Sequence, residues 1–459
     1  MGHSRELGHG VRASRGPGVG GEGFSGRRWT IMVYMAADND LEPQALADLA
    51  EIKAVGSTPQ VTVVAQLDMA RAGAPTRRYY LSRLRTLEAD AVDPPLGETN
   101  TGDAGDLARF IAWGLDTYPA DRYALVLWNH GVGWGDGATI VPWPEEGRGT
   151  ANEASARRGA RPPVLRRPIF RATGEGILAR GIAWDASSQD FLDNAEIKRA
   201  LDAVLLLSGL ERLDLLGFDA CLMQMLEVAY QVKGMARCVV ASQEVEPDGG
   251  WPYHTILRRL AAWPEADGAQ LGAMVVDAYL RACDPTASAT QSVLDLERID
   301  DVVGALDALC RCVLGNVTAA RPFVLGAARA AQRYRDPDCR DLYDFCRVIW
   351  DHTADMPLRA RAYELMALLD PAGPDRFVVS EGHRGERVAR SHGVSVYFPD
   401  AALSPCYRRL DLSNDSLWDD MLRAVLGAQR KRRAPKRPAF HNRLICPDSR
   451  RHTGTAPVR

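Results

Sequence analysis

The chain has 459 residues, 46% of them hydrophobic, and a formal net charge of -3 at pH 7. This length and apolar content suffice for one large buried core and a smaller second region. The small net charge gives no general attraction to nucleic acid or to an anionic membrane. The longest apolar runs have the length of strands and fall short of the roughly 20 residues of a membrane-spanning helix. The first residues lack the apolar stretch of a signal peptide, so we expect a cytoplasmic protein, or a secreted one if the start is misassigned.

Both ends of the chain have a polar, biased composition. Residues 1–28 are rich in Gly, Arg and Ser, which predicts a disordered leader. The leader matches the phosphate-loop pattern GxGxxG between Gly18 and Gly23, but a phosphate loop follows a strand and this match precedes the first one, so we interpret it as low complexity. Residues 428–459 carry clustered Arg and Lys among prolines and are predicted to form a disordered, solvated basic tail, with a nucleic-acid or membrane contact as the alternative.

Strand and helix patterns alternate along the first part of the chain. A buried strand is predicted at its start and is followed by a helix that we expect the short polar residues Asp38, Asn39 and Asp40 to cap. The pattern then continues with further strands and helices in the same order. The strands are predicted over 29–35, 61–67, 78–84 and 123–128, and the helices over 41–54 and 107–117. This alternation predicts an α/β fold with a mostly parallel sheet flanked by helices.

An arginine-rich segment interrupts this pattern at 144–176 and is predicted to be an exposed loop. After it the alternation resumes, and the chain ends in several helices and a late strand. Strands are predicted over 213–216, 238–242 and 394–398, helices over 193–207 and 222–232, and a loop over 244–252. We therefore expect a core domain at 29–300 and a mostly helical accessory region at 301–427.

Two of the predicted strands end on reactive side chains. The strand at 123–128 runs into Asn129, His130 and Gly131, and the strand at 213–216 runs toward Asp219 and Cys221. The carboxyl ends of parallel strands face the ligand crevice of an open α/β sheet, so a histidine and a cysteine at such ends can meet over a substrate. A buried structural thiol and a structural histidine are the alternatives.

The residues around His130 and Cys221 favour a catalytic role for this pair over a structural one. A helix predicted to begin near Leu222 would favour the thiolate of Cys221 through its amino terminus. Gly131 allows its backbone N–H to approach a substrate oxyanion, while the imidazole of His130 protonates a leaving amine. A nucleotide site around Gly133 is a weaker alternative, because the helix that should follow is missing from the pattern.

Several segments together resemble the clostripain family of cysteine peptidases. The resemblance lies in residues 29–42, the Asn-His-Gly motif at 129–131, the Asp-Ala-Cys motif at 219–221, and the segments 241–248 and 393–399. It implies a caspase-like fold and a catalytic dyad of His130 and Cys221, with the backbone N–H groups of Gly131 and Cys221 as the oxyanion hole.

The resemblance also implies cleavage after a basic residue, and a buried guanidinium needs carboxylate partners. Asp219 and Asp248 match the positions that line the pocket for the basic side chain in that family. A helix cap and a turn residue, respectively, are the structural alternatives. We expect peptide or protein substrates with basic residues, a monomer, and no nucleic-acid or membrane partner.

Members of that family often cut themselves between the histidine and cysteine segments. The arginine-rich segment lies in this interval, and Arg161 and Arg167 within it precede proline. The remaining candidates for self-cleavage are Arg148, Arg157, Arg158 and Arg171.

Calcium dependence varies in the family, so the resemblance allows a calcium requirement; we expect no other cofactor, and no EF-hand spacing is present. A catalytically silent interaction module built on the same fold is the second hypothesis for the chain as a whole.

Overall fold

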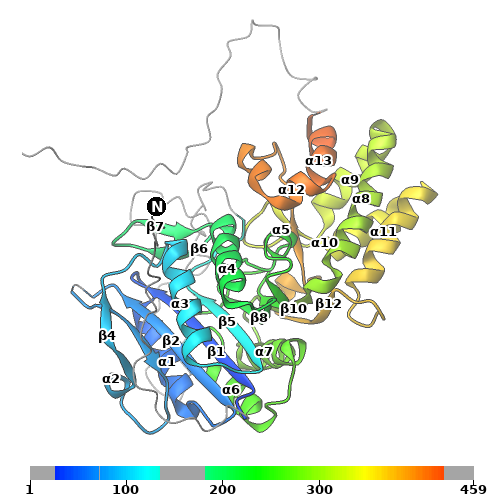
Figure 1. Ribbon diagram of the computed structural model, residues 1–459. Coiled ribbons are helices and arrows are strands. Elements are labelled where there is room, and N and C mark those ends of the chain that lie inside the picture. The colour runs from blue at the N-terminus through cyan, green and yellow to red at the C-terminus, as the bar shows by residue number, and fades with distance from the viewer. Residues whose placement is uncertain (1–25, 72, 135–180, 428–459) are drawn as a thin grey trace, which may run out of the picture.

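The computed structural model describes residues 26–71, 73–134 and 181–427. They form a large sheet with helices on both faces and a second, mostly helical region beside it (Figure 1). Within these residues, no helix is both long enough and apolar enough to cross a membrane. The α/β class predicted from the alternating pattern is confirmed.

The main sheet has nine strands among the described residues. Its five central strands are parallel, and two antiparallel strands continue it on each side. In sheet order the strands are β12 (Val378–Arg384), β10 (Ala289–Asp295), β9 (Ala236–Ala241), β8 (Leu213–Asp219), β5 (Arg122–Trp128), β1 (Trp29–Ala37), β2 (Val61–Met69), β3 (Thr76–Tyr80) and β4 (Ala91–Gly97). Two short pairs lie outside it: β6 (Ile182–Asp185) with β7 (Asp190–Leu192), and β11 (Cys339–Asp341) with β13 (Ser395–Tyr397).

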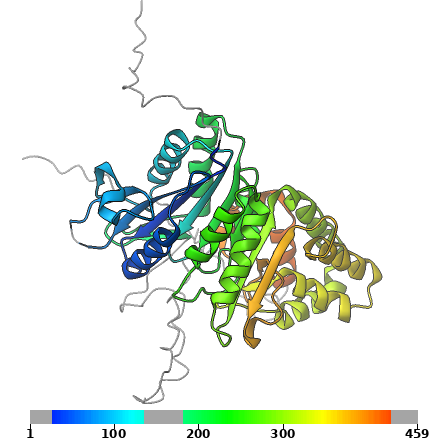
Figure 2. The same cartoon turned by 90° about the horizontal axis from the view of Figure 1, so that it is seen from below.

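Apolar side chains project from both faces of the central strands, so other elements must pack against both faces. Met32 and Tyr34 of β1 belong to one hydrophobic cluster, and Ile31 and Val33 belong to the other. Figure 2 shows α1 (blue) and α3 (cyan) on opposite sides of the sheet. The helices of the first face are α3 (Ala104–Thr117), α4 (Asn194–Ser208) and α5 (Leu226–Gln231); those of the second are α1 (Glu42–Val55), α6 (Tyr253–Ala262) and α7 (Gly268–Ala282).

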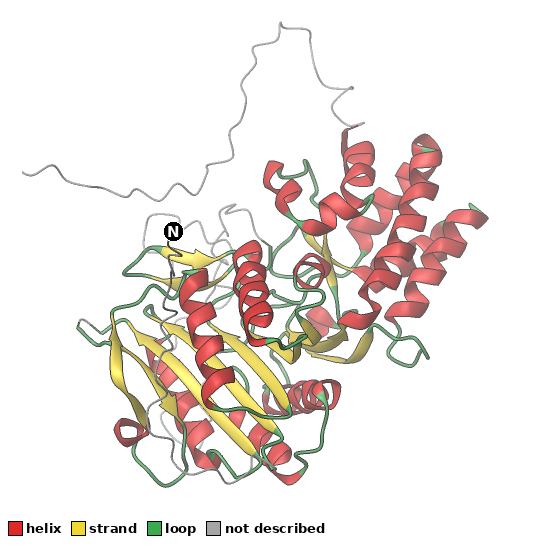
Figure 3. Ribbon diagram, viewed as in Figure 1, coloured by secondary structure: helices red, strands yellow, loops and turns green. Residues whose placement is uncertain are grey.

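Helices dominate the chain after residue 298 (Figure 3). They are α8 (Ile299–Gly315), α9 (Val317–Ala330), α10 (Leu342–His352), α11 (Met356–Leu369), α12 (Asp411–Asp415) and α13 (Trp418–Gly427). Their apolar faces belong to the same buried cluster as the first face of the sheet. This region also supplies β12, the edge strand of the main sheet.

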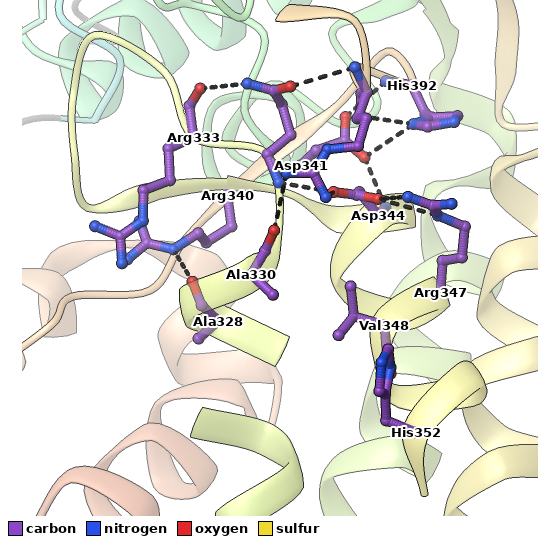
Figure 4. A network of polar contacts seen from close by, with 12 residues as sticks. Ala328, Ala330, Arg333, Arg340, Asp341, Asp344, Arg347, Val348, His352 and His392 are labelled. Atoms are coloured by element: carbon purple, nitrogen blue, oxygen red, sulfur yellow. Dashed lines mark hydrogen bonds and ion pairs between the residues drawn. The ribbon is translucent and has the colours of Figure 1, made fainter. Parts of the chain in front are cut away.

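The polar contacts of the helical region gather where β11 runs into α10 (Figure 4). Asp341 caps α10 by accepting from the backbone N–H of Asp344 at 2.8 Å. The buried Asp344 carboxylate in turn forms ion pairs with Arg347 at 2.6 Å and Arg390 at 3.1 Å. Each buried negative charge at this junction therefore has a cationic or hydrogen-bonding partner.

Two local expectations from the sequence are wrong. The helix expected over 222–232 is only α5, Leu226–Gln231, because the chain makes a turn with a left-handed residue, Leu222, at φ 63°. The short polar residues before α1 do not cap it in the expected way, since Leu41 occupies the cap position without a side-chain hydrogen bond. The helix α2 (Leu87–Asp90) and the strand β4 gave no clear pattern and were missed.

Several expectations fall wholly or largely outside the described residues and stay predictions. They are the leader 1–28 with the Gly18–Gly23 match, the glycine run after Gly133, the loop 144–176 with Arg148, Arg157, Arg158 and Arg171, and the basic tail 428–459.

Candidate active site

The ends of β5 and β8 bring the histidine and cysteine turns together. The two strands are adjacent and parallel, with Trp128 opposite Asp219. The pairing extends past the strand, since the backbone N–H of Asn129 donates to the carbonyl of Asp219 at 3.4 Å. A Cβ atom built on Gly131 would lie 2.4 Å from the carbonyl oxygen of Cys221. The His130-Gly131 turn is therefore packed directly against the backbone of the cysteine.

The loop after β9 wraps around the cysteine turn. The N–H of Leu222 donates to the carbonyl of Glu244 at 3.3 Å, and that of Gln224 donates to Ser242 at 3.0 Å. Leu222 holds a positive φ of 63°, which a bulky side chain rarely adopts. Strain of this kind persists where the surrounding structure determines the backbone, and it gathers at functional sites.

The helix amino terminus expected to activate Cys221 is not there, because α5 begins only at Leu226. The backbone N–H of Glu246 instead donates to Cys221 Sγ at 3.3 Å. A donor to sulfur favours the thiolate over the thiol, since hydrogen bonding to the charged form stabilises that form. The loop after β9 thus provides the stabilisation of the thiolate that the sequence analysis attributed to a helix amino terminus.

A carboxylate that the sequence analysis assigned to a helix cap contacts the histidine. The Nε2 atom of His130 lies 2.8 Å from Oδ1 of Asp40, with the imidazole 1% and the carboxylate 40% exposed. Asp40 follows the end of β1, which is the strand next to β5. Its position at a third strand end was the signal that could have identified it.

Acidic side chains surround the cysteine turn on the side of β8 and β9. Asp219 is fully buried and accepts a hydrogen bond from the hydroxyl of Tyr253 at 2.9 Å. Glu246 is also fully buried and accepts from Gln291 at 3.3 Å. Asp248 lies half-buried on the same loop. The sequence analysis singled out the two aspartates and missed Glu246, whose burial no local pattern indicated.

The pKa of Tyr279 in α7 is affected by the acidic groups of this region. Burial raises the pKa of its phenol well above the usual value, and the nearby Glu246, Cys283, Cys221 and Asp219 raise it further. An anion is disfavoured where acidic groups already stand, whereas a cation is favoured there.

A second acidic group lies at the ends of β1 and β2. One carboxylate oxygen from each of Asp38, Asp68 and Glu98 lies within 4.8 Å of the others. Burial, followed by the charges of Asp185, Glu98 and Asp38, raises the pKa of Asp68 to about 7, against a lowering by its hydrogen bond from Thr76. Carboxylate oxygens are the ligands that Ca²⁺ and Mg²⁺ take in proteins.

The chain matches the clostripain family over residues 33–143 and 171–420. It is 29% identical to clostripain of Hathewaya histolytica over 257 residues, which are 51% of this chain and 42% of clostripain. The matching part thus spans less than half the length of that relative.

Solved structures of bacterial cysteine proteases share the fold. A secreted cysteine protease from Bacteroides thetaiotaomicron in complex with an irreversible peptide inhibitor has a TM-score of 0.55 and 19% identity, over 87% of this chain and 99% of that one. An inactive zymogen protease from Parabacteroides distasonis has a TM-score of 0.58 and 18% identity, over 85% of this chain and 98% of that one. The residues matched by the family include the His130 and Cys221 turns, and the chain belongs to the clostripain family of cysteine peptidases.

Proposed function

We propose that this chain is a cysteine endopeptidase that hydrolyses peptide bonds after arginine or lysine. The observation that carries the proposal is the contact between the two turns, in which Gly131 packs on the carbonyl of Cys221. This contact places one imidazole and one thiol at the same edge of the sheet, with buried carboxylates of Asp219 and Glu246 beside the thiol. A thiol nucleophile, a proton donor and an acidic subsite are the parts that such a reaction needs.

The reaction proceeds in two steps. The thiolate of Cys221 attacks the scissile carbonyl carbon, and the imidazolium of His130 gives its proton to the departing amine. Water then attacks the thioester, its proton passes to His130, and the acid product leaves with the thiol restored. Asp40 accepts from Nε2 of the imidazole, so the catalytic proton is exchanged at Nδ1.

Backbone N–H groups stabilise the oxyanion that forms in both steps. Gly131 and Cys221 are the candidates, and the close packing between them keeps both groups on adjacent turns. Preorganised donors of this type are typically worth about 10²–10³ in kcat each.

Specificity for a basic side chain follows from the acidic surroundings of the thiol. Asp219 ends β8 and Asp248 lies on the loop after β9, so the carboxylates approach the site from two neighbouring strands. A guanidinium that leaves water is stable only opposite such partners. Catalysis and specificity thus share one loop, because Glu246 donates to the thiol and Asp248 follows it.

Self-processing belongs to the same proposal. The interval that contains Arg148, Arg157, Arg158 and Arg171 starts and ends beside the catalytic turns, since the N–H of Val132 donates to the carbonyl of Gly181 at 3.1 Å. An inactive zymogen is also described for the protease from Parabacteroides distasonis.

Fluorogenic peptides that end in Arg, Lys, Gln or Asp test the function. We expect cleavage after Arg and Lys under reducing conditions, with and without calcium, and at least 10³-fold less after Gln or Asp. Cys221→Ala should abolish it, whereas Cys312→Ala, at a half-buried thiol of α8, should leave it unchanged.

Two results would contradict the proposal. Cleavage that survives Cys221→Ala would refute the mechanism. Absence of cleavage by the wild type, also after limited proteolysis, would favour the silent interaction module.

A further inference from the structure

The helical region contacts the loop after β9 through one buried amide. Gln243 is the second residue of that loop and is 2% exposed. Its Nε2 donates to Oδ2 of Asp341 at 3.1 Å, and its Oε1 accepts from the backbone N–H of Gly393 at 3.1 Å. A carboxylate cannot donate and an N–H cannot accept, so the two partners fix the orientation of the amide. One side chain thus joins the loop to two segments of the helical region.

Asp341 is itself held firmly where β11 meets α10. It is fully buried and lies beside His392 (Figure 4). Its carboxylate accepts from the hydroxyl of Tyr334 at 3.1 Å, and from the backbone N–H groups of Asp344 and His392 at 2.8 and 2.7 Å. Donors from several segments thus keep the carboxylate in one place, and Gln243 binds to a fixed point.

The residue opposite Asp341 contacts the cysteine turn. Asp341 pairs with Ser395 in the short sheet of β11 and β13. The backbone N–H of Ser395 donates to the carbonyl of Gln224 at 3.0 Å, and its hydroxyl donates to the same carbonyl at 3.1 Å. Gln224 lies three residues after Cys221. Two facing residues of one short sheet therefore fix the loop and the cysteine turn relative to each other.

The loop and the cysteine turn meet at the sulfur. The N–H of Glu246, three residues after Gln243, donates to Sγ of Cys221 at 3.3 Å. A second contact from the helical region reaches the loop at Glu244, whose Oε1 accepts from the backbone N–H of Arg335 at 3.2 Å. A misplacement of about 1 Å costs roughly 10²-fold in the rate of an enzymatic reaction. The position of this donor therefore matters for a reaction at the sulfur.

We propose that Gln243 is a positioning residue, through which Asp341 of the helical region keeps the N–H of Glu246 at the thiol. The helical region then takes part in activating Cys221, besides covering one face of the sheet. The support of the loop stands on the contacts described above, whereas its effect on catalysis rests on the proposed function. Because Gln243 acts through the donor to the sulfur, its effect belongs to kcat and to the reactivity of the thiol, and not to KM.

Gln243→Met in the full-length chain tests this role, because methionine is unbranched and fills the same space without the two hydrogen bonds. We expect kcat for a fluorogenic Arg peptide to fall at least fivefold, with KM within twofold of the wild type. Alkylation of Cys221 by iodoacetamide at pH 6, followed by mass spectrometry, should slow at least threefold, since the thiolate is the nucleophile. Gln243→Asn, whose amide is one methylene too short for both partners, should change both rates in the same direction.

Gln66 of β2 offers a matched control. It is 1% exposed and also joins a carboxylate to a donor, since its Nε2 donates to Asp106 at 2.7 Å and its Oε1 accepts from Nε of Arg78 at 3.0 Å. Three strands separate β2 from β9 in the sheet. Gln66→Met should therefore lower Tm as Gln243→Met does, and leave kcat, KM and the alkylation of Cys221 unchanged. All proteins are compared as preparations with the same chain composition on a denaturing gel, so that self-processing does not contribute.

A lower Tm in Gln243→Met with alkylation as fast as in the wild type, or faster, would overturn the positioning role and leave a structural contact. Equal losses of kcat and alkylation rate in Gln66→Met would overturn it as well. The alkylation assay needs no peptide cleavage. A wild type that cleaves no peptide would therefore refute the proposed function alone, and slower alkylation of Gln243→Met would still support the positioning of the loop.

Discussion

Gly131 lies where the histidine turn packs against the cysteine turn. A methyl group at this position would lie 2.4 Å from the carbonyl oxygen of Cys221 and 3.0 Å from Ala220 Cβ. Non-bonded carbon and oxygen atoms overlap strongly at 2.4 Å, so the histidine and cysteine turns would have to move apart.

We therefore expect Gly131→Ala to lower the free energy of unfolding by about 1–3 kcal/mol, the usual cost of overpacking, and to abolish peptide cleavage. Gly304→Ala is the matched control, because a Cβ at this position of α8 meets no atom within 4 Å. It should gain up to about 1 kcal/mol from better helix propensity and keep full activity. Urea unfolding and the peptide assay measure both effects; an active Gly131→Ala variant would refute the close approach.

In the proposed mechanism, Asp40 acts on the reaction through His130, as a positioning residue. Replacing it by Asn keeps the shape of the side chain but removes the negative charge beside the imidazole. We expect Asp40→Asn to reduce kcat roughly 10- to 100-fold, within the range that general acid–base catalysis contributes, with KM little changed.

The separate effects on kcat and KM distinguish this role from a structural one. Asp40 contacts the imidazole and not the substrate, so Asp40→Asn should lower kcat and leave KM nearly unchanged. The exposed Asp93 on the edge strand β4 gives the control Asp93→Asn, which should match the wild type. An unchanged kcat in Asp40→Asn, or a change confined to KM, would contradict the positioning role.

The sequence singled out the histidine and cysteine because each follows an apolar run, and the structure places their turns in contact. Their catalytic roles stay predictions. Asp40 was missed because a short polar residue before a helix has a sufficient local explanation as a cap. Its partner lies 90 residues away in the chain, and only the order of strands brings the two together.

Among the elements, α5 shows how a short helix joins the sheet to the helical region. Its Glu227 is fully buried and accepts from the N–H of Tyr397 at 2.9 Å and from the hydroxyl of Tyr407 at 2.8 Å. Burial raises the pKa of Glu227 to about 7, against the lowering effect of these two hydrogen bonds.

A carboxyl group with a raised pKa stabilises the fold least when it is ionised. Its contribution is fully present below the unfolded value near 4.5 and is lost as pH rises through about 7. Glu227→Gln stays neutral and keeps an oxygen for both donors. At about 1.4 kcal/mol per pKa unit, we expect it to be up to about 3 kcal/mol more stable than its parent at pH 8 and nearly equal at pH 4.

Urea unfolding of the Cys221→Ala parent with and without Glu227→Gln, at both pH values, checks this expectation. Glu364→Gln, a surface glutamate paired with Arg361, serves as control and should change neither value by more than about 0.5 kcal/mol. A Glu227→Gln variant that is less stable at pH 8 would show that the carboxylate itself is needed.

Long, mostly apolar runs such as β1, β2 and β5 were predictable, because strands buried on both faces consist largely of apolar residues. Short elements were not. The helix α2 has four residues, and α5 has six and begins after a strained turn that no propensity indicates. Tertiary contacts determine such segments, since the wrapping loop after β9 fixes residues 222–224.

At the scale of the whole molecule, the sheet is built from both sides of the arginine-rich interval. β5 pairs with β8 over five residue pairs, from Ala124 with Leu215 to Trp128 with Asp219. The buried cluster on the first face also contains residues from both sides. Cutting the interval therefore removes no contact between these parts.

We expect the processed protein to migrate as two polypeptides on a denaturing gel and as one particle of unchanged mass in size-exclusion chromatography. The proposed self-processing would require Cys221, so Cys221→Ala should remain one chain, whereas Cys312→Ala should be cut like the wild type. Two separate species under native conditions would show that the strand pairing does not hold the parts together.

The class of fold was predictable from alternating patterns, but the order of strands was not. Nothing local to β12 indicates that a strand from the helical region closes the edge of the main sheet beside β10. Such pairings depend on which apolar faces remain uncovered after the core has formed.

The adjoining ends of the arginine-rich interval have a consequence for its length. The backbone N–H of Val132 donates to the carbonyl of Gly181, so the two ends of the chain segment between these residues lie next to each other. The entropic cost of bringing the two ends of a loop together grows only with the logarithm of the loop length, by about 0.6 kcal/mol for each doubling. Loop closure alone therefore makes the free energy of folding depend only weakly on the number of residues between Val132 and Gly181.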